Sequence, residues 1–345
     1  MANTSSRDSR AIWRTALGGF GRILGFVVVG VLIVMAIAVW REPLRWRLAA
    51  QDFFVLANHQ PTPQEQRWGD ELALTDEAKD IMYAAHPELV ENKSFGDVCP
   101  TKEETNVLGC YLTTSKIYVL DVEQASIEAV ETVTLAHEIL HAAWDRLPNA
   151  DKQQLEQELL NYYRSADDDQ LTKLISGYRR SAPTGQADAV TATELHSILA
   201  TEYSDLSQEL EQHYANYFND REAVVKTYRS YEDQFESRQQ RAEKLSSQLE
   251  QLQSDIEQKG ELIDRQISRN DELIAQIDQL RGEGRVEESN QLVPVQNQLV
   301  DQINANITEL NQQIDRFNSL RTSYEQVSVE LNQLFDSLNT REPLQ

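Results

Sequence analysis

The chain has 345 residues and a formal net charge of −24, with 56 acidic against 32 basic side chains. A field of that sign repels the phosphates of DNA and RNA, so a nucleic-acid partner is excluded. The only two cysteines, Cys99 and Cys110, are not in a CxxC pair, which argues against a cysteine-based zinc site. The length allows more than one domain.

The N-terminal region combines a basic tail with an apolar run. Residues 1–22 are polar and basic, and residues 23–40 carry no charge. As a helix, this run is about 27 Å long, close to the hydrocarbon thickness of a bilayer. We therefore predict a transmembrane helix over 23–40, a cytoplasmic tail over 1–22, and the bulk of the chain outside the cytoplasm. A buried core helix is one alternative, and a cleavable signal peptide is the other, because Ala36-Ile37-Ala38 has the pattern of a cleavage site.

Residues 41–70 contain three prolines, and we expect a linker there. A globular domain is expected over residues 71–234. Its first helix is predicted to start after Thr75, a suitable N-cap followed by two acidic residues, and to end before Pro87.

The two cysteines flank a segment with turn residues near both ends. Outside the cytoplasm, Cys99 and Cys110 are expected to close a short disulfide loop, and two free buried thiols are the alternative. From Gly109 to Val122, β-branched and aromatic residues predict a pair of strands, one of them over residues 116–120.

A His-Glu-x-x-His motif follows, formed by His137, Glu138 and His141. A helix is predicted here from about residue 128 to 146. Four residues turn a helix by about 400°, so the two imidazoles lie on one face and can share a metal ion. Glu138 lies about 100° further round the helix, where a general base must stand to deprotonate a metal-bound water. A core helix with two hydrogen-bonded histidines is the alternative.

The motif and its uncharged flanks resemble the active-site helix of the zincin metallopeptidases. The resemblance implies one zinc ion held by His137 and His141, with Glu138 as general base. It also implies a small sheet over the helix, whose edge strand binds the substrate backbone. The HExxHxxGxxH pattern has Gly and His where this chain has Trp144 and Leu147. The resemblance therefore points to the gluzincin branch, in which a glutamate of a later helix is the third ligand.

A helix predicted over residues 189–206 offers that third ligand. Glu194 is preferred, because the apolar Leu195 follows it directly and the small Ser197 follows after one intervening residue, as in gluzincins. Glu202 is the runner-up, because it lies within an apolar stripe and needs a partner if it is buried. Asp205 and His196 are the remaining alternatives.

From residue 235 to 340, apolar residues recur at alternating spacings of three and four, which is typical of a coiled coil. Two glycines, at 282 and 284, interrupt the pattern. We predict an antiparallel hairpin that folds back there and pairs Leu280 with about Leu292. A long helix that pairs between two chains is the alternative.

Together these patterns predict a mostly helical α+β protein. Its parts are an N-terminal transmembrane helix, a small zincin-like domain with a short sheet, and a C-terminal antiparallel coiled-coil hairpin. The expected function is that of a membrane-anchored, extracytoplasmic zinc peptidase acting on a peptide or protein substrate. The alternative is a catalytically inert envelope adaptor. In either case the hairpin is expected to bind a protein partner or to self-associate.

Overall fold

The computed structural model describes residues 31–99, 107–122, 124 and 127–338. The chain divides into two compact units. One holds the described residues up to 122 and residues 128–229, and the other holds residues 230–338 with the described residues between 124 and 127. The prediction of a mostly helical chain with a small sheet and a C-terminal helical hairpin is confirmed.

The predicted membrane helix needs correction. Residues 23–30 of the expected span lie outside the described residues. In the part that the structure describes, no helix is both long enough and apolar enough to cross a bilayer. Helical residues 31–40 are about 15 Å long, roughly half the hydrocarbon thickness. The prediction of a single-pass membrane protein with its bulk outside the cytoplasm is therefore wrong for the described chain.

Two helices occupy the range in which we expect a linker. They are α2 (Pro43–Leu56) and α3 (Pro63–Glu71). Each has proline at its start, where the missing N–H leaves no intrahelical bond unmade. These prolines therefore begin helices. At α3, Thr62 and Glu65 form a capping box, in which each side chain accepts a hydrogen bond from the other residue's backbone N–H.

The next elements build a three-stranded sheet. Helix α4 (Asp76–Ala85) starts at the Thr75 cap, as predicted, and leads into β1 (Glu88–Glu91). The predicted strand pair is confirmed as β2 (Gly109–Leu112) and β3 (Lys116–Asp121), which are antiparallel. Strand β1 is an addition that the sequence pattern does not predict. It pairs in parallel with β3, so the strand order is β1-β3-β2 and β2 lies at an edge.

The predicted disulfide is confirmed. Cys99 follows α5 (Asn92–Val98), and its bond to Cys110 ties the end of this helix to β2. The Cα atoms of the two cysteines lie 5.9 Å apart. Residues 100–106 between them lie outside the described residues. The disulfide therefore fixes the edge strand to the end of α5, in addition to the ladder between β2 and β3.

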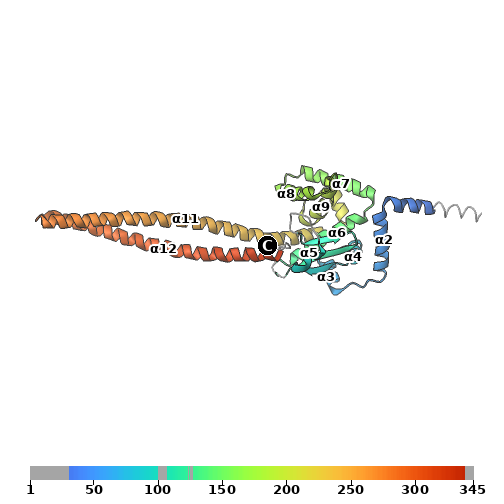
Figure 1. Ribbon diagram of the computed structural model, residues 1–345, viewed down its shortest axis with the longest axis horizontal. Helices are drawn as coiled ribbons and strands as arrows, with labels where there is room; N and C mark the ends of the chain where they lie inside the picture. The colour runs from blue at the N-terminus through green and yellow to red at the C-terminus, as the bar shows by residue number, and fades with distance from the viewer. Residues whose placement is uncertain (1–30, 100–106, 123, 125–126, 339–345) are drawn as a thin grey trace, which may run out of the picture. The chain divides into compact units, whose positions relative to one another are not determined.

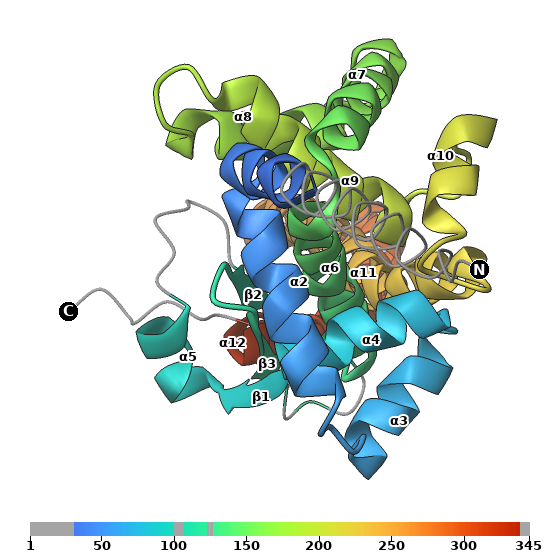
Figure 2. The ribbon, with the colours of Figure 1, turned by 90° about the vertical axis from the view of Figure 1, so that its right-hand side faces the viewer.

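Helix α6 (Ala129–Arg146), which carries the motif, lies in the middle of the first unit. It packs against α2, α4, α9 and the sheet strands β2 and β3 (Figure 2). Nearly every turn of α6 contributes buried apolar residues, including Leu135, Ile139 and Leu140. The helices that follow it are α7 (Asn149–Ser165), α8 (Asp169–Ser181) and α9 (Ala187–Glu202).

A tyrosine-rich segment closes the first unit. After α10 (Gln208–Tyr214), Tyr217 accepts a backbone hydrogen bond from Thr75, and Phe218 forms a bridge with Leu74. Arg221 is 7% exposed and donates to the backbone oxygens of Ala200, Tyr203 and Ser204 at the end of α9. The carbonyls that α9 leaves without helical partners are thereby satisfied.

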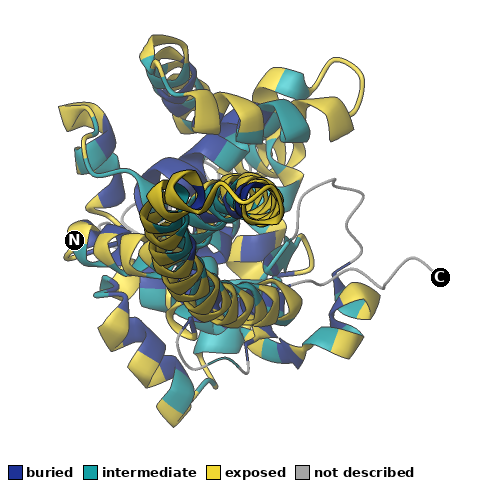
Figure 3. Cartoon of the chain, turned by 90° about the vertical axis from the view of Figure 1, so that its left-hand side faces the viewer, coloured by how far each residue is buried: buried dark blue, intermediate teal, exposed yellow. Residues whose placement is uncertain are grey.

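The second unit is an antiparallel helical hairpin. Its helices are α11 (Arg221–Gly282), which begins in the first unit, and α12 (Val286–Leu338) (Figure 1). Gly284 takes a left-handed conformation in the turn, with φ of 81°. Asn270 pairs with Gln296 and Gln266 with Asn306 across the seam, close to the predicted register. The outer faces of the hairpin are mostly exposed (Figure 3).

Candidate metal centre

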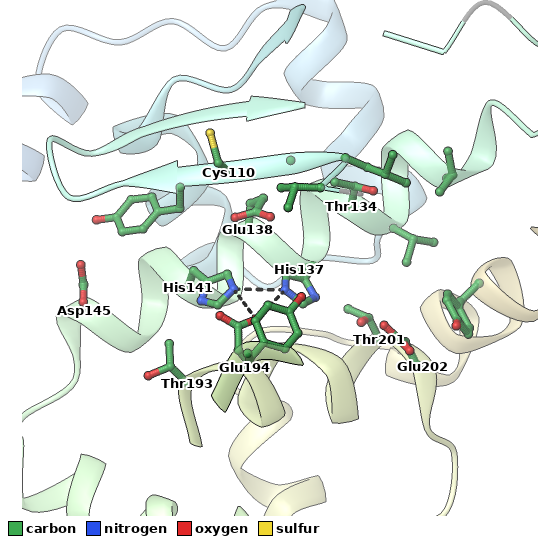
Figure 4. A pocket seen from close by; sticks show the side chains of 18 of the residues that line it. Cys110, Thr134, His137, Glu138, His141, Asp145, Thr193, Glu194, Thr201 and Glu202 are labelled. Atoms are coloured by element: carbon green, nitrogen blue, oxygen red, sulfur yellow. Dashed lines mark hydrogen bonds and ion pairs between the residues drawn. The ribbon is translucent and has the colours of Figure 1, made fainter. Parts of the chain in front are cut away.

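The two histidines of the motif lie on one face of α6, as their spacing requires (Figure 4). Nε2 of His141 lies 3.1 Å from Nε2 of His137, and the ring centroids are 4.8 Å apart. Because the opposite face of the helix is packed into the core, the helix cannot rotate to carry the two imidazoles away from this point. Helix α6 thus delivers two nitrogen donors to one point.

Helix α9 brings a carboxylate to the same point. Oε2 of Glu194 lies 3.7 Å from Nε2 of His137 and 3.6 Å from Nε2 of His141. Helices α6 and α9 pack directly against each other. Ser197, the small residue that follows Glu194 in the expected pattern, is fully buried on α9.

The three donor atoms have the separations that a zinc ion requires. Nitrogen and oxygen ligands about 2.0–2.1 Å from a tetrahedral zinc ion are about 3.3–3.4 Å from one another. The observed pairwise distances of 3.1, 3.6 and 3.7 Å bracket that value. Two imidazoles and one carboxylate also form a known donor set for catalytic zinc, which leaves a fourth position for water. These residues therefore fit the metal that the motif implies.

The metal-free triad is held together by charge. Burial opposes the charge on Glu194, but the charge of His141 and hydrogen bonds from both histidines outweigh it and lower the pKa of Glu194 to about 2. Burial also opposes the charge on His141, yet the Glu194 carboxylate raises the pKa of this imidazole to about 9. A proton on His141 therefore takes the place of a cation when no metal is bound.

Glu138 lies beside the triad and points toward the sheet (Figure 4). Its side chain is buried, with 6% of the residue exposed, and this burial raises the pKa of its carboxyl. The backbone N–H of Tyr111 on β2 donates a hydrogen bond to it. The carboxyl is thus oriented by the edge strand and is not one of the three clustered ligands.

Gly109 lets the edge strand approach the motif helix. A Cβ atom at this position would lie 2.5 Å from Cγ2 of Thr134 and 2.9 Å from Cγ of Glu138. Real Cβ atoms do not come that close to other heavy atoms, so only glycine allows β2 to lie at this distance from α6. The sequence offers no sign of this role, because it depends on the packing of two distant segments.

A cavity of about 430 Å³ opens over the triad. Its walls come from β2, α6 and α9, and Tyr178 of α8 and Tyr228 of α11 complete them. Asp145 also faces the cavity, and burial raises the pKa of its carboxyl. We find no sequence signal that singles out these three residues among the many tyrosines and acids of the chain.

The other candidate ligands are placed elsewhere. Glu202 lines the same cavity at the end of α9, but it is not part of the described cluster of metal-ligand groups (Figure 4). His196 points to the other side of α9, where its Nε2 lies 2.8 Å from Nε2 of His213. Asp205 lies beyond the last residue of α9 and is not in that cluster either. Of the four alternatives, the structure brings Glu194 to the histidines.

Comparison of the chain with protein-family models, with curated proteins and with solved structures found no match in any of the three.

Proposed function

We propose that this chain is a zinc-dependent peptidase of the zincin type, with a gluzincin-like ligand set. The observation that carries the proposal is the convergence of His137, His141 and Glu194 from two helices, with a separate buried carboxyl at Glu138. A structural zinc site needs four protein ligands and no base beside them. Three ligands, a base and a cavity above them are what a hydrolytic site requires.

His137, His141 and Glu194 would hold the ion. Zinc supplies a Lewis acid that polarises a peptide carbonyl and makes a nearby water more acidic. The histidines must be neutral to bind it, so the proton on His141 leaves when the metal enters. Glu194 stays ionised throughout, because its pKa lies far below neutrality.

Glu138 would be the general base. Its raised pKa brings the carboxyl closer to the operating pH, at which a base both accepts a proton and returns it efficiently. It takes a proton from the attacking water and then delivers one to the amine of the cleaved bond. The hydrogen bond from Tyr111 holds the carboxyl in place for both steps.

Strand β2 would position the substrate. It is an edge of the described sheet, and Gly109, Cys110 and Tyr111 all line the cavity. An extended peptide can add to such an edge through backbone hydrogen bonds, which orients the scissile bond without demanding a particular side chain. This arrangement favours unfolded or extended peptide segments as substrates.

The test is hydrolysis of an internally quenched peptide library by the zinc-loaded chain. Glu138→Gln keeps the shape of the side chain but removes the base, and we expect cleavage to fall by about 10²–10⁴-fold while zinc stays bound. Glu194→Gln should lose one equivalent of zinc together with activity, whereas Glu202→Gln should keep the metal. Glu236→Gln removes the same charge from the exposed surface of the hairpin and serves as the matched control. Zinc binding without cleavage by the unmodified chain would contradict the proposal.

One observation favours the alternative of an inert adaptor. Ile267 and Ile274 on α11 are each 41% exposed, and Ile307 and Ile314 on α12 are each 38% exposed. Each pair is one heptad apart, so the described hairpin presents apolar stripes beyond its own seam. A partner helix would cover them. If Ile267→Lys with Ile274→Lys abolishes a concentration-dependent increase in mass but leaves peptide cleavage unchanged, association and catalysis are separate functions.

A further inference from the structure

A second cluster of metal-binding side chains lies in the first unit, formed by His59, Glu65 and His86. One donor atom from each residue lies within 4.8 Å of the other two. The three residues come from separate segments: the loop after α2, the first turn of α3 and the end of α4. They line a cavity of about 420 Å³ that shares no residue with the one above the triad.

The contact between His59 and Glu65 has the form expected of two ligands of one ion. Nε2 of His59 lies 3.2 Å from Oε2 of Glu65. Nevertheless, this buried nitrogen makes no hydrogen bond with any described residue, although the carboxylate oxygen lies within hydrogen-bond distance. Adjacent ligands of a metal are this close while their lone pairs point to a third position. A plain ion pair would instead align the N–H with the oxygen.

Both of these side chains are held in place before any ion binds. Glu65 is 5% exposed, and its Oε2 accepts a hydrogen bond of 2.7 Å from the N–H of Thr62. The ring of His59 stacks on Tyr83, with centroids 5.1 Å apart and an angle of 29° between the planes. A ligand fixed by such contacts loses little freedom on binding.

His86 supplies the third donor, and its backbone is constrained while its side chain is exposed. It ends α4 in the left-handed conformation, with φ of 44°, which residues other than Gly, Asn and Asp rarely adopt. Its ring meets that of His59 edge-on at 5.5 Å. Because His86 is exposed, its side chain can swing by the small distance that closes the cluster to coordination distance.

The charges around the cluster suit a divalent cation. Lys116 also lines this cavity, but its Nζ lies 2.9 Å from Oε2 of Glu88, so the two charges compensate each other. The Glu65 carboxylate and the two imidazoles remain as the donor groups of the cluster. Imidazole nitrogens with one carboxylate oxygen favour zinc and similar first-row ions over calcium or magnesium, which prefer oxygen alone.

We propose that His59, Glu65 and His86 form a second binding site for a divalent transition-metal ion, with zinc as the natural candidate. The ion would join the α2–α3 loop to the turn between α4 and β1, and water from the cavity would complete its coordination. Its role there is to hold these segments together. The proposal does not depend on the peptidase activity.

The test counts metal bound by the full chain, using zinc ions alone and elemental analysis after gel filtration. We expect two equivalents for the unmodified chain and one for His86→Asn, in which asparagine tolerates the left-handed backbone. His141→Ala removes the first site and should also leave one equivalent, and the double variant should bind none. Gln64→Ala, in the same cavity but outside the cluster, is the matched control and should keep two.

Thermal unfolding gives an independent measurement. Added zinc should raise the melting temperature of His141→Ala but not that of the double variant, because only a native-state ligand stabilises the fold. One equivalent in the unmodified chain that His86→Asn leaves unchanged would overturn the second site and leave the peptidase proposal standing. One equivalent that His86→Asn removes and His141→Ala does not would instead support this site and overturn the first.

Discussion

The buried polar groups of the two units have different surroundings and different partners. In the first unit, buried carboxyls and imidazoles point toward a cavity, where several of them are held away from their ordinary protonation states. In the hairpin, two pairs of amide side chains, Asn270 with Gln296 and Gln266 with Asn306, hydrogen-bond to each other across the seam. The buried polar groups of the first unit therefore face a cavity, which is the arrangement typical of functional sites, whereas those of the hairpin determine which residues face each other.

The two arrangements also differ in their effect on the free energy of unfolding. A buried ionisable group that faces a cavity lowers stability unless a partner or a metal compensates it. A neutral amide pair that is satisfied across a seam costs little. We therefore expect substitutions in the first unit to have larger effects and to depend on pH, and substitutions in the hairpin to have smaller effects that do not.

Zinc binding should show the largest dependence on pH. In the metal-free protein His141 carries a proton up to about pH 9, whereas Glu194 is already ionised above about pH 2. Each unit of pH below 9 should thus weaken apparent zinc affinity about tenfold, or about 1.4 kcal/mol, and binding at pH 7 should release about one proton. Calorimetry in buffers of different ionisation enthalpy measures this release. No net release would show that His141 is neutral before the metal enters.

Loss of Arg221 should destabilise the first unit by about 2–3 kcal/mol, because its guanidinium satisfies several backbone oxygens at the end of α9. The change to test is Arg221→Met, measured by urea unfolding. Arg229→Met, at an exposed position further along α11, is the control and should change the free energy of unfolding by no more than about 0.5 kcal/mol. Equal effects of the two changes would mean that the capping contacts contribute nothing.

Glu131 should make the first unit less stable at high pH. Burial raises the pKa of its carboxyl to about 7, although its Oε1 accepts a hydrogen bond from the N–H of Val122. Between pH 4.5 and 7 the folded state binds more protons than the unfolded state, so stability falls as pH rises. Glu131→Gln should add about 2–3 kcal/mol above pH 7 and almost nothing at pH 4. A gain that is the same at both values would exclude this titration as its cause.

The smallest effect is expected in the hairpin. Asn270→Leu alone leaves Gln296 without its partner and should cost about 1 kcal/mol, whereas changing both residues to leucine should recover it. Thermal unfolding of Asn270→Leu, Gln296→Leu and the double variant measures the coupling between the two residues. The double variant should also lose its unique pairing, which would appear as a mixture of oligomers by light scattering. A double variant that is less stable than either single one would contradict the comparison.

Sequence patterns predicted the hairpin and the motif helix well, because both follow from spacings within one segment. They also predicted the β2–β3 pair and the Cys99–Cys110 disulfide. Strand β1 escaped prediction, since Glu88–Glu91 is short and has charged residues at both ends. The prolines at the first positions of α2 and α3 look the same in sequence whether they interrupt a helix or begin one.

The site was predictable only where its chemistry is local. His137, Glu138 and His141 lie within one helical turn, so the spacing alone places them. The preference for Glu194 over Glu202 came from a family resemblance, and the packing of α6 on α9 is what brings Glu194 to the histidines. The cluster of His59, Glu65 and His86 has no sequence motif, because its residues come from three separate segments that meet only after folding.

The disulfide has a consequence for the wall of the cavity. Cys110 belongs to the strand that orients Glu138, and it is the covalent link between that strand and the end of α5. Under reducing conditions the strand would keep its ladder to β3 and its packing on α6 but lose its covalent link to the end of α5. A thiol reagent could therefore loosen the position of Glu138 without touching His137, His141 or Glu194, which would couple the redox state of the surroundings to the proposed peptidase activity.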